Sequence, residues 1–153
     1  MAIVQVAASR AFPVPAPLVY DILADYREGH PSILPDAFSN LEVLEGGIGT
    51  GTVIQFDLTL AGRKSTTTAT VSEPQPGRVL REVESERGLV TTFTVESKGS
   101  GGCRVAIVTS WKASGLKGLV ERLLVPGLLR PLYEEQLDKL GQVAGARYTA
   151  SRS

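Results

Sequence analysis

Tyr26 and His30 are the two side chains in this sequence that are best suited to moving a proton. Residues four apart share a face of a helix, so the two rings would lie together if a helix continued as far as His30. An unperturbed imidazole titrates near neutrality, and the pair could therefore act as a general acid and base. Gly29 and Pro31 oppose a continuous helix. The alternative interpretation of His30 is a surface histidine in a proline-rich turn.

Other catalytic and metal-binding patterns are absent from the sequence. With one histidine and one cysteine, Cys103, the chain cannot build a metal site from several imidazoles or form an internal disulfide. No CxxC, HExxH or GxSxG motif occurs, and the glycines of residues 46–51 lack the Lys-Ser/Thr that follows in a phosphate loop. We predict no metal and no other cofactor, and we interpret Cys103 as a small buried residue.

Composition and charge are those of an ordinary globular protein. Of the 153 residues, 42% are hydrophobic and 21% are charged, which excludes wholesale disorder. The net charge is zero, so the totals give no argument for a nucleic-acid or anionic-membrane partner, although a local basic patch stays open. The sequence shows neither a secretory signal nor an apolar run long enough to cross a bilayer. We expect a cytoplasmic monomer or homodimer without integral membrane association.

Hydrophobic periodicity predicts the order of the secondary-structure elements. Residues 3–12 are typical of a strand, residues 17–26 of a short helix, and residues 27–36 of an irregular turn or one helical turn. Alternation with period two then predicts five or six strands, joined by short turns as an antiparallel meander. Leucines at helical spacing predict a long C-terminal helix, which Pro126 and Pro131 must bend or interrupt.

This order predicts an α+β fold in which the long helix covers one face of a curved antiparallel sheet. Such a sheet rarely closes perfectly on a helix, and the gap becomes an apolar cavity. The inward positions mix large apolar groups with a few hydroxyls, and they are Ile54, Phe56, Leu58, Leu89, Thr91, Phe93, Val105, Ile107, Thr109 and Trp111. The predicted ligand-binding residues are Phe56, Leu58, Leu89, Thr91, Phe93, Ile107, Thr109 and Trp111 of the sheet, with Leu124 and Leu128 of the helix.

Several of the remaining side chains have both a structural and a functional interpretation. Trp111 is either a packing residue or a wall on which a flat ring stacks, and Tyr133 is either core or a hydroxyl donated to the cavity. The strand register that puts Leu80 inside leaves Arg81 in water, and we favour it over an inward arginine. The threonine run of residues 66–70 suits a strand, and alternate members could also line the pocket.

Four segments resemble the START-like (SRPBCC) superfamily, in particular its polyketide cyclase/dehydrase-like family. Residues 9–26 resemble the opening of that domain, residues 71–80 its turn between strands, residues 101–105 its glycine turn before the last strand, and residues 128–140 its closing helix. The resemblance covers about residues 3–143. It implies a helix-grip fold with a hydrophobic cavity between sheet and C-terminal helix, in one START-like ligand-binding domain over residues 1–153. The family includes polyketide aromatase/cyclases and carriers of lipids and quinones, and it has no universal catalytic motif.

We therefore predict a protein that binds a small hydrophobic molecule, of aromatic, polyketide-like or lipid-like character. The alternative is a polyketide cyclase or aromatase-like enzyme. Its cavity would position a flexible chain, and Tyr26, His30 or Tyr133 would move protons. A third interpretation is an interaction module whose groove takes a partner helix, because a broken apolar helix can leave a patch exposed.

Overall fold

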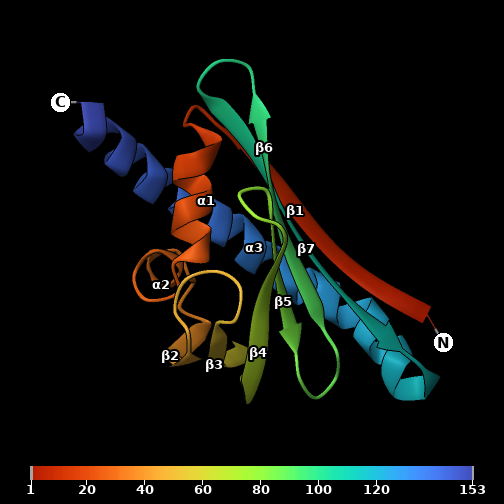
Figure 1. The fold of residues 1–153 in the computed structure, drawn as a ribbon. Coiled ribbons are helices and arrows are strands. Elements are labelled where there is room, and N and C mark those ends of the chain that lie inside the picture. Colours follow the sequence, from red (N-terminus) through yellow and green to blue (C-terminus); the bar gives the residue numbers. More distant parts are fainter. Residues whose placement is uncertain (1, 153) are drawn as a thin grey trace.

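The computed structural model describes residues 2–152, and its seven strands form one antiparallel sheet with a long helix across one face (Figure 1). The elements are β1 (Ala2–Phe12), α1 (Ala16–Ala24), α2 (Gly29–Ser32), β2 (Phe38–Glu45), β3 (Val53–Leu60), β4 (Arg63–Gln75), β5 (Val79–Glu84), β6 (Val90–Lys98), β7 (Gly102–Ala113) and α3 (Gly115–Arg152). The strand order is β1-β7-β6-β5-β4-β3-β2, so β2 to β7 form the predicted meander and β1 closes it against β7. The predicted α+β architecture is confirmed.

Alternation along the strands decides which face of the sheet is buried. In β1, the side chains of Val4, Val6 and Ala8 are buried while those between them are exposed. β7 shows the same alternation, with Cys103, Val105 and Ile107 buried. These three residues pair with the C-terminal half of β1. Because successive side chains of a strand point to opposite faces, the whole sheet presents one apolar face to the helices. Cys103 is buried, as expected for a structural residue, and burial raises the pKa of its thiol.

The helix α3 lies diagonally across this face and contacts β1, β7 and α1 (Figure 1). Its inner side chains Leu137 and Leu140 are almost completely buried. The sequence predicts that Pro126 and Pro131 bend or interrupt the helix, and of these two alternatives the interruption does not occur, because α3 continues through both prolines. Proline has a helical φ and removes one backbone hydrogen bond. The apolar contacts of Leu129 and its neighbours with the sheet offset that loss.

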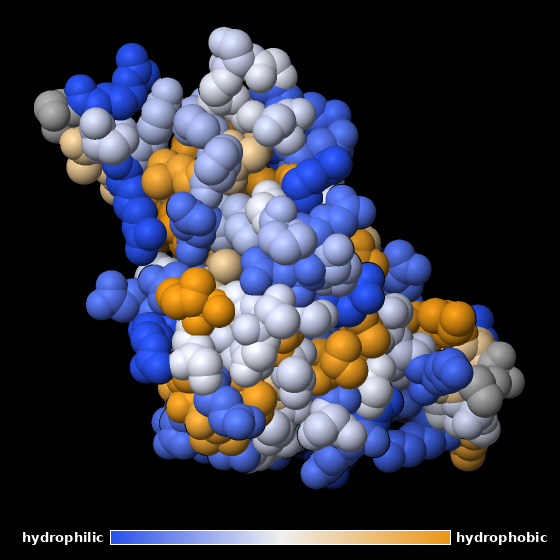
Figure 2. Space-filling view, in the orientation of Figure 1, coloured by the Kyte–Doolittle hydropathy of each residue, from blue (hydrophilic) through white to orange (hydrophobic). Residues whose placement is uncertain are grey.

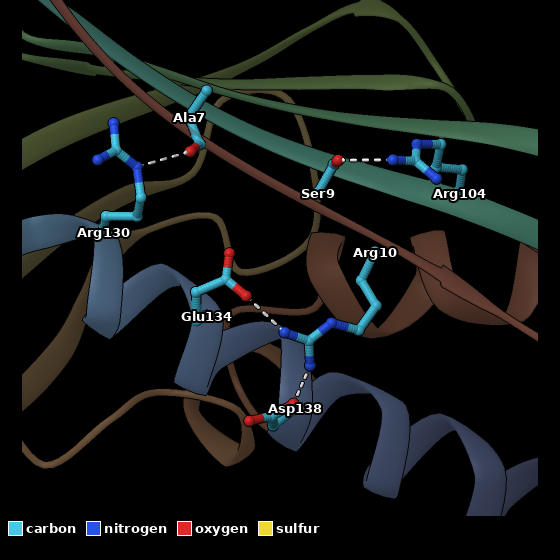
Figure 3. A network of polar contacts seen from close by, with 7 residues as sticks. All are labelled: Ala7, Ser9, Arg10, Arg104, Arg130, Glu134 and Asp138. Atoms are coloured by element: carbon cyan, nitrogen blue, oxygen red, sulfur yellow. Dashed lines mark hydrogen bonds and ion pairs between the residues drawn. The ribbon is translucent and has the colours of Figure 1, made fainter.

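Arg10 of β1 fixes the middle of α3 to the edge of the sheet (Figure 3). Its Nη2 donates to Glu134 Oε2 over 2.5 Å, and its Nη1 donates to Asp138 Oδ1. The two carboxylates are four residues apart and therefore share a face of the helix. Arg130, one turn earlier, donates from Nε to the carbonyl oxygen of Ala7 over 3.4 Å. These contacts lie on both sides of Tyr133 in the sequence and determine where this side chain meets the sheet.

No helix within residues 2–152 is long and apolar enough to cross a membrane.

Candidate functional site

A cavity of about 470 Å³ lies between the sheet and α3. Its apolar walls come from β2, β3, β6, β7 and α3 and from the segment after α2, and they include Leu34, Phe38, Leu41, Ile54, Phe56, Leu58, Leu60, Leu89, Phe93, Trp111, Val125 and Leu129. Its polar lining includes His30, Glu82, Thr91, Thr109, Tyr133 and Gln136. The exposed residues Arg87, Lys112 and Lys117 also line it, so the cavity opens to solvent there.

Most of the predicted ligand-binding residues line this cavity. Those that do are Phe56, Leu58, Leu89, Thr91, Phe93, Thr109 and Trp111. Ile107 is buried in the core without lining the cavity, while Leu124 and Leu128 are 60% and 39% exposed on the outside of α3. Val125 and Leu129, each one position further along, form the helical wall in their place. Both sides of this part of α3 are apolar, so periodicity alone does not distinguish the inner side from the outer one.

Tyr26 and His30 come together even though no continuous helix connects them. The helix α1 ends at Ala24 and α2 starts at Gly29, yet the two rings stack with their centroids 4.4 Å apart. His30 is 3% exposed, so the interpretation as a surface histidine is wrong. Phe93 packs its ring edge-on against the imidazole, with a centroid distance of 5.4 Å.

The backbone around His30 fixes the orientation of its ring. The His30 Nδ1 lies 2.8 Å from the carbonyl oxygen of Leu23, which can only accept, so Nδ1 carries the hydrogen and Nε2 faces the cavity side. Gly29 packs so closely on α1 that a Cβ there would collide with the carbonyl oxygen of Ile22. The short turn Gly29–Ser32 therefore holds the imidazole in place through contacts that only glycine allows.

Glu82 is the acidic partner of this pair, and the sequence interpretation missed it. Tyr26 donates from its hydroxyl to Glu82 Oε2 over 2.6 Å, and His30 Nε2 lies 3.6 Å from the same oxygen. Burial raises the pKa of Tyr26 well above its ordinary value, and the charge of Glu82 and the hydrogen bond to it add to this rise. The three side chains form a polar cluster, which we call the Glu82 cluster.

The register of β5 explains why Glu82 points inward. Leu80 is fully buried, as the favoured register predicts, and Glu82 lies two residues later on the same face. Arg81 faces the other way, but it is half-buried and its Nε is buried without a hydrogen-bond partner among the described residues. The alternation that placed Leu80 inside is also the signal that could have found Glu82.

A second polar group joins two strands to the helix. Thr91 Oγ1 of β6 lies 2.7 Å from Thr109 Oγ1 of β7, which lies 2.5 Å from the hydroxyl of Tyr133 on α3. Tyr133 is 6% exposed and lines the cavity. Burial raises the pKa of Tyr133 to about 12, although the hydrogen bond between Tyr133 and Thr109 acts to lower this pKa. At neutral pH the hydroxyl is therefore protonated and can donate.

Gln136, one turn after Tyr133, is a polar side chain that the sequence interpretation also missed. It is 3% exposed and lines the cavity. Its side-chain amide makes no hydrogen bond within residues 2–152, in contrast to the hydroxyls of Thr109 and Tyr133. The amide is not among the buried polar atoms without a partner, so it is open to the cavity and can offer a donor and an acceptor to a bound molecule.

The described residues contain no group of three His, Cys, Asp or Glu side chains that could hold a metal ion. The side chains that line the cavity include the carboxylates of Glu82, Glu84 and Glu121, one imidazole, one phenol, threonine hydroxyls and one amide. Such a set can bind hydroxyl and carbonyl groups, and it can accept or donate a proton.

The comparisons with known proteins place this fold and cavity in one family. Residues 4–145 match the family described as polyketide cyclase / dehydrase and lipid transport. The chain belongs to this family. The match covers nearly the whole chain and confirms the resemblance to START-like proteins. No curated protein matches the chain.

Solved structures share the fold of this family member over nearly its whole length. The KanY protein is 30% identical, with a TM-score of 0.82 and coverage of 95% of this chain and 99% of its own. The Zhui aromatase/cyclase from Streptomyces sp. R1128 is 20% identical, with a TM-score of 0.75 and coverage of 95% and 96%. Norcoclaurine synthase from Thalictrum flavum, in complex with dopamine and hydroxybenzaldehyde, is 14% identical, with a TM-score of 0.71 and coverage of 93% and 86%. The last two show a shared fold.

Proposed function

We propose that the protein encloses one small hydrophobic molecule that carries a ring and a hydroxyl or carbonyl group. The observation that carries the proposal is Gln136, whose amide makes no hydrogen bond to another described residue and is open to a cavity whose other walls are mainly apolar. A volume of about 470 Å³ is within the range of small-molecule sites, which combine apolar walls with a few polar groups that orient the ligand.

The walls favour a flat, apolar ligand body. Phe56, Phe93 and Trp111 contribute aromatic faces or edges to the lining, and leucines fill the space between them. Aromatic rings pack well on one another in stacked or edge-on geometry, at little entropic cost. An aromatic or polyketide-like molecule therefore fits the lining better than a strongly polar one.

The polar side chains favour a ligand that both donates and accepts hydrogen bonds. Gln136 has both capacities free, and the carboxylate of Glu82 accepts. A phenolic hydroxyl or a ketone would hydrogen-bond the amide in place of water when the ligand enters the cavity. This distinguishes the proposed ligand from a plain hydrocarbon chain, which would leave the amide unsatisfied.

The first test is native mass spectrometry of the protein purified from cells, beside the same sample after denaturation. A retained small-molecule mass supports the proposal and identifies the ligand. If the spectrum shows only the mass of the protein without a ligand, the next measurement is thermal shift with aromatic, polyketide-like, quinone and lipid compounds. If none of these compounds raises the melting temperature, the binding proposal is wrong.

The second test uses a matched pair of glutamine variants. Gln136→Leu should weaken binding of a phenolic or ketone-bearing ligand by roughly 5-fold to 30-fold, since one neutral hydrogen bond is worth about 1–2 kcal/mol. Gln142→Leu, at an exposed position of the same helix, should leave binding unchanged. Equal affinities of the two variants would remove Gln136 from the site.

The second candidate function is a cyclase-like enzyme, and the Glu82 cluster is the observation that favours it. A carboxylate in an apolar cavity can remove a proton from carbon next to a ketone, and a neutral phenol or amide can hydrogen-bond the ketone oxygen. Glu82 would then be the base, while Tyr133 and Gln136 would hold the substrate. His30 would orient the carboxylate and exchange protons with it.

Glu82→Gln separates the two functions. An enzyme should lose turnover of a poly-β-ketone substrate by at least 100-fold while still binding it, because the amide cannot accept the proton. A carrier shows no turnover before or after the change, and its affinity changes only modestly.

In either case we propose that one START-like domain over residues 1–153 acts in the cytoplasm on a small hydrophobic molecule, without nucleic acid.

A further inference from the structure

The outer side of the first half of α3 carries most of the exposed apolar surface in residues 2–152. Six of the ten large apolar side chains that are exposed lie there: Leu116, Leu119, Val120, Leu123, Leu124 and Leu128. Their spacing of three and four residues places them along one face, which we call the outer α3 face. Leu116 is 79% and Leu123 is 72% exposed, so the fold itself leaves these leucines in water.

The packing of α3 on the sheet does not account for this face. Gly118, Val125 and Leu129 form the inner side of the same segment and line the cavity. The segment from Leu116 to Leu128 is thus apolar toward the cavity and also toward solvent. Clustered exposed apolar side chains of this kind mark a surface that binds another molecule or a membrane. Figure 2 shows apolar atoms at the lower right, where both the start of β1 and the first turns of α3 lie in Figure 1.

Basic side chains accompany the outer α3 face. Lys117 and Arg122 are exposed side chains of the same segment of α3, Lys112 and Arg130 lie at its two ends in the sequence, and Glu121 is the only acidic residue between them. None of the four basic side chains forms an ion pair with a residue in the described part of the chain. A chain of zero net charge therefore has a local excess of positive charge at its apolar face. The charge totals give no argument for an anionic partner, and the local basic patch that they leave open lies here.

We propose that the outer α3 face docks on the surface of an anionic phospholipid bilayer. Leucines on a helix that lies in the interface enter the boundary of the acyl chains, and the long stems of lysine and arginine reach the phosphates. Because the exposed side chains Lys112 and Lys117 also line the cavity, docking brings this edge of its opening near the lipid surface. The inference does not depend on the proposed function.

A second copy of the chain fits the face less well. A symmetric dimer over this patch would bring Lys117 and Arg122 near their own copies, where like charges repel. The segment is about 20 Å long, and one helix face of that length is small beside the roughly 800 Å² per partner of a standard protein interface. A bilayer needs no complementary shape and supplies the opposite charge.

The test is cosedimentation of the purified protein with two kinds of vesicle. One contains equal parts of phosphatidylcholine and phosphatidylglycerol, and the other contains phosphatidylcholine alone. The protein should bind the anionic vesicles at least tenfold more tightly, and the preference should decrease as salt increases. The double variant Lys117→Gln/Arg122→Gln should lose about tenfold or more of the binding to anionic vesicles.

A matched pair of apolar variants tests the face itself. Leu116→Asn/Leu123→Asn should weaken binding to the anionic vesicles by roughly tenfold or more, since two apolar side chains no longer enter the bilayer. The control Leu44→Asn/Ile48→Asn changes two side chains that are 50% and 65% exposed elsewhere and should bind like the unmodified protein. Unchanged melting temperatures show that these surface variants are folded.

Three outcomes overturn the proposal. The first is that the unmodified protein does not bind anionic vesicles at physiological salt. The second is equal weakening by the test pair and the control pair. The third is a dimer in sedimentation velocity that Leu116→Asn/Leu123→Asn converts to monomer, which would assign the face to a second copy. Neither Leu116 nor Leu123 lines the cavity, so ligand binding stays a separate measurement.

Discussion

Tyr26 and Glu82, 56 residues apart in the sequence, meet in a 2.6 Å hydrogen bond from the phenol to the carboxylate. This bond links the segment between the two short helices to the middle of the sheet, at the inner wall of the cavity. The side chain of Glu82 is only 12% exposed, so few water molecules can solvate its carboxylate. The hydrogen bond from Tyr26 therefore stabilises the carboxylate in the folded protein.

Tyr26→Phe should lower the free energy of unfolding by about 2 kcal/mol, because a hydrogen bond to a buried charged group is lost while the carboxylate remains. For a chain of this length, that loss corresponds to a decrease in melting temperature of roughly 4–8 °C. The control is Tyr148→Phe, whose ring packs near Arg152 rather than on the cluster. Thermal unfolding followed by circular dichroism measures both. Equal melting temperatures for the two variants would show that the bond contributes nothing.

Gly29→Ala should disturb the site, whereas Gly145→Ala should stabilise the protein. A Cβ at residue 29 would collide with the carbonyl oxygen of Ile22, so α2 must move away from α1 and carry His30 with it. We expect a loss of about 2 kcal/mol or more. A Cβ at residue 145, inside α3, would meet open space, and alanine there should add roughly 0.5–1 kcal/mol. Urea unfolding of the two variants should give changes of opposite sign, and changes of the same sign would contradict the placement of Gly29.

Arg10→Gln should cost about 1 kcal/mol or less. The side chains of Arg10, Glu134 and Asp138 are 32%, 43% and 59% exposed, so solvent screens their attraction. The loss should decrease at high salt, as expected of partly exposed charges. Lys98→Gln, whose partner Glu96 lies in the same exposed strand end, is the control and should have no measurable effect. Urea unfolding at low and high salt measures both variants, and a salt-independent loss for Arg10→Gln would point to packing rather than charge.

Tyr20→Phe should destabilise the protein at pH 7 and much less at pH 3. The hydroxyl of Tyr20 donates to Glu73 Oε2 over 2.7 Å, and this bond lowers the pKa of Glu73 below its ordinary value of 4.5. A carboxyl group with a lowered pKa in the folded state stabilises the protein above its unfolded pKa, and this stabilisation is lost as the pH falls through the folded pKa. The difference between the two proteins should therefore be roughly 1–2 kcal/mol at pH 7 and should shrink below about pH 4. Urea unfolding at both values checks this, and an equal difference at pH 3 would mean that charge on Glu73 is not involved.

The sequence predicted the strands well because their signal is local. In β3, for example, apolar and polar residues alternate from Ile54 to Leu60, and the strand extends over Val53–Leu60. The long C-terminal helix was also predicted, but which of its apolar sides faces the cavity was not. Leu124 and Val125 are equally apolar, and only the position of the sheet distinguishes them.

The polar part of the site was predicted less completely because it depends on contacts between distant segments. Tyr26 and His30 were paired by their spacing of four, yet they meet through a turn held by Leu23 and Gly29 rather than through a helix. Glu82 could have been found by counting two residues from Leu80. Gln136 gives no such signal, since a glutamine on a long helix is usually exposed.

The position of β1 at the edge of the sheet has a consequence for the order of folding. Among residues 2–152, β1 pairs with β7 alone, and this pairing joins Ala2 with Ala113 and Phe12 with Cys103. β1 also packs on α3. On the ribosome, β1 is synthesised first, while its partners are synthesised last. The hairpins of the meander from β2 to β7 can each close as their second strand emerges from the ribosome. β1, in contrast, stays unpaired until most of the chain has been made. Closing the sheet with β1 is therefore the step with the largest loop to close, and we expect it to be late in folding.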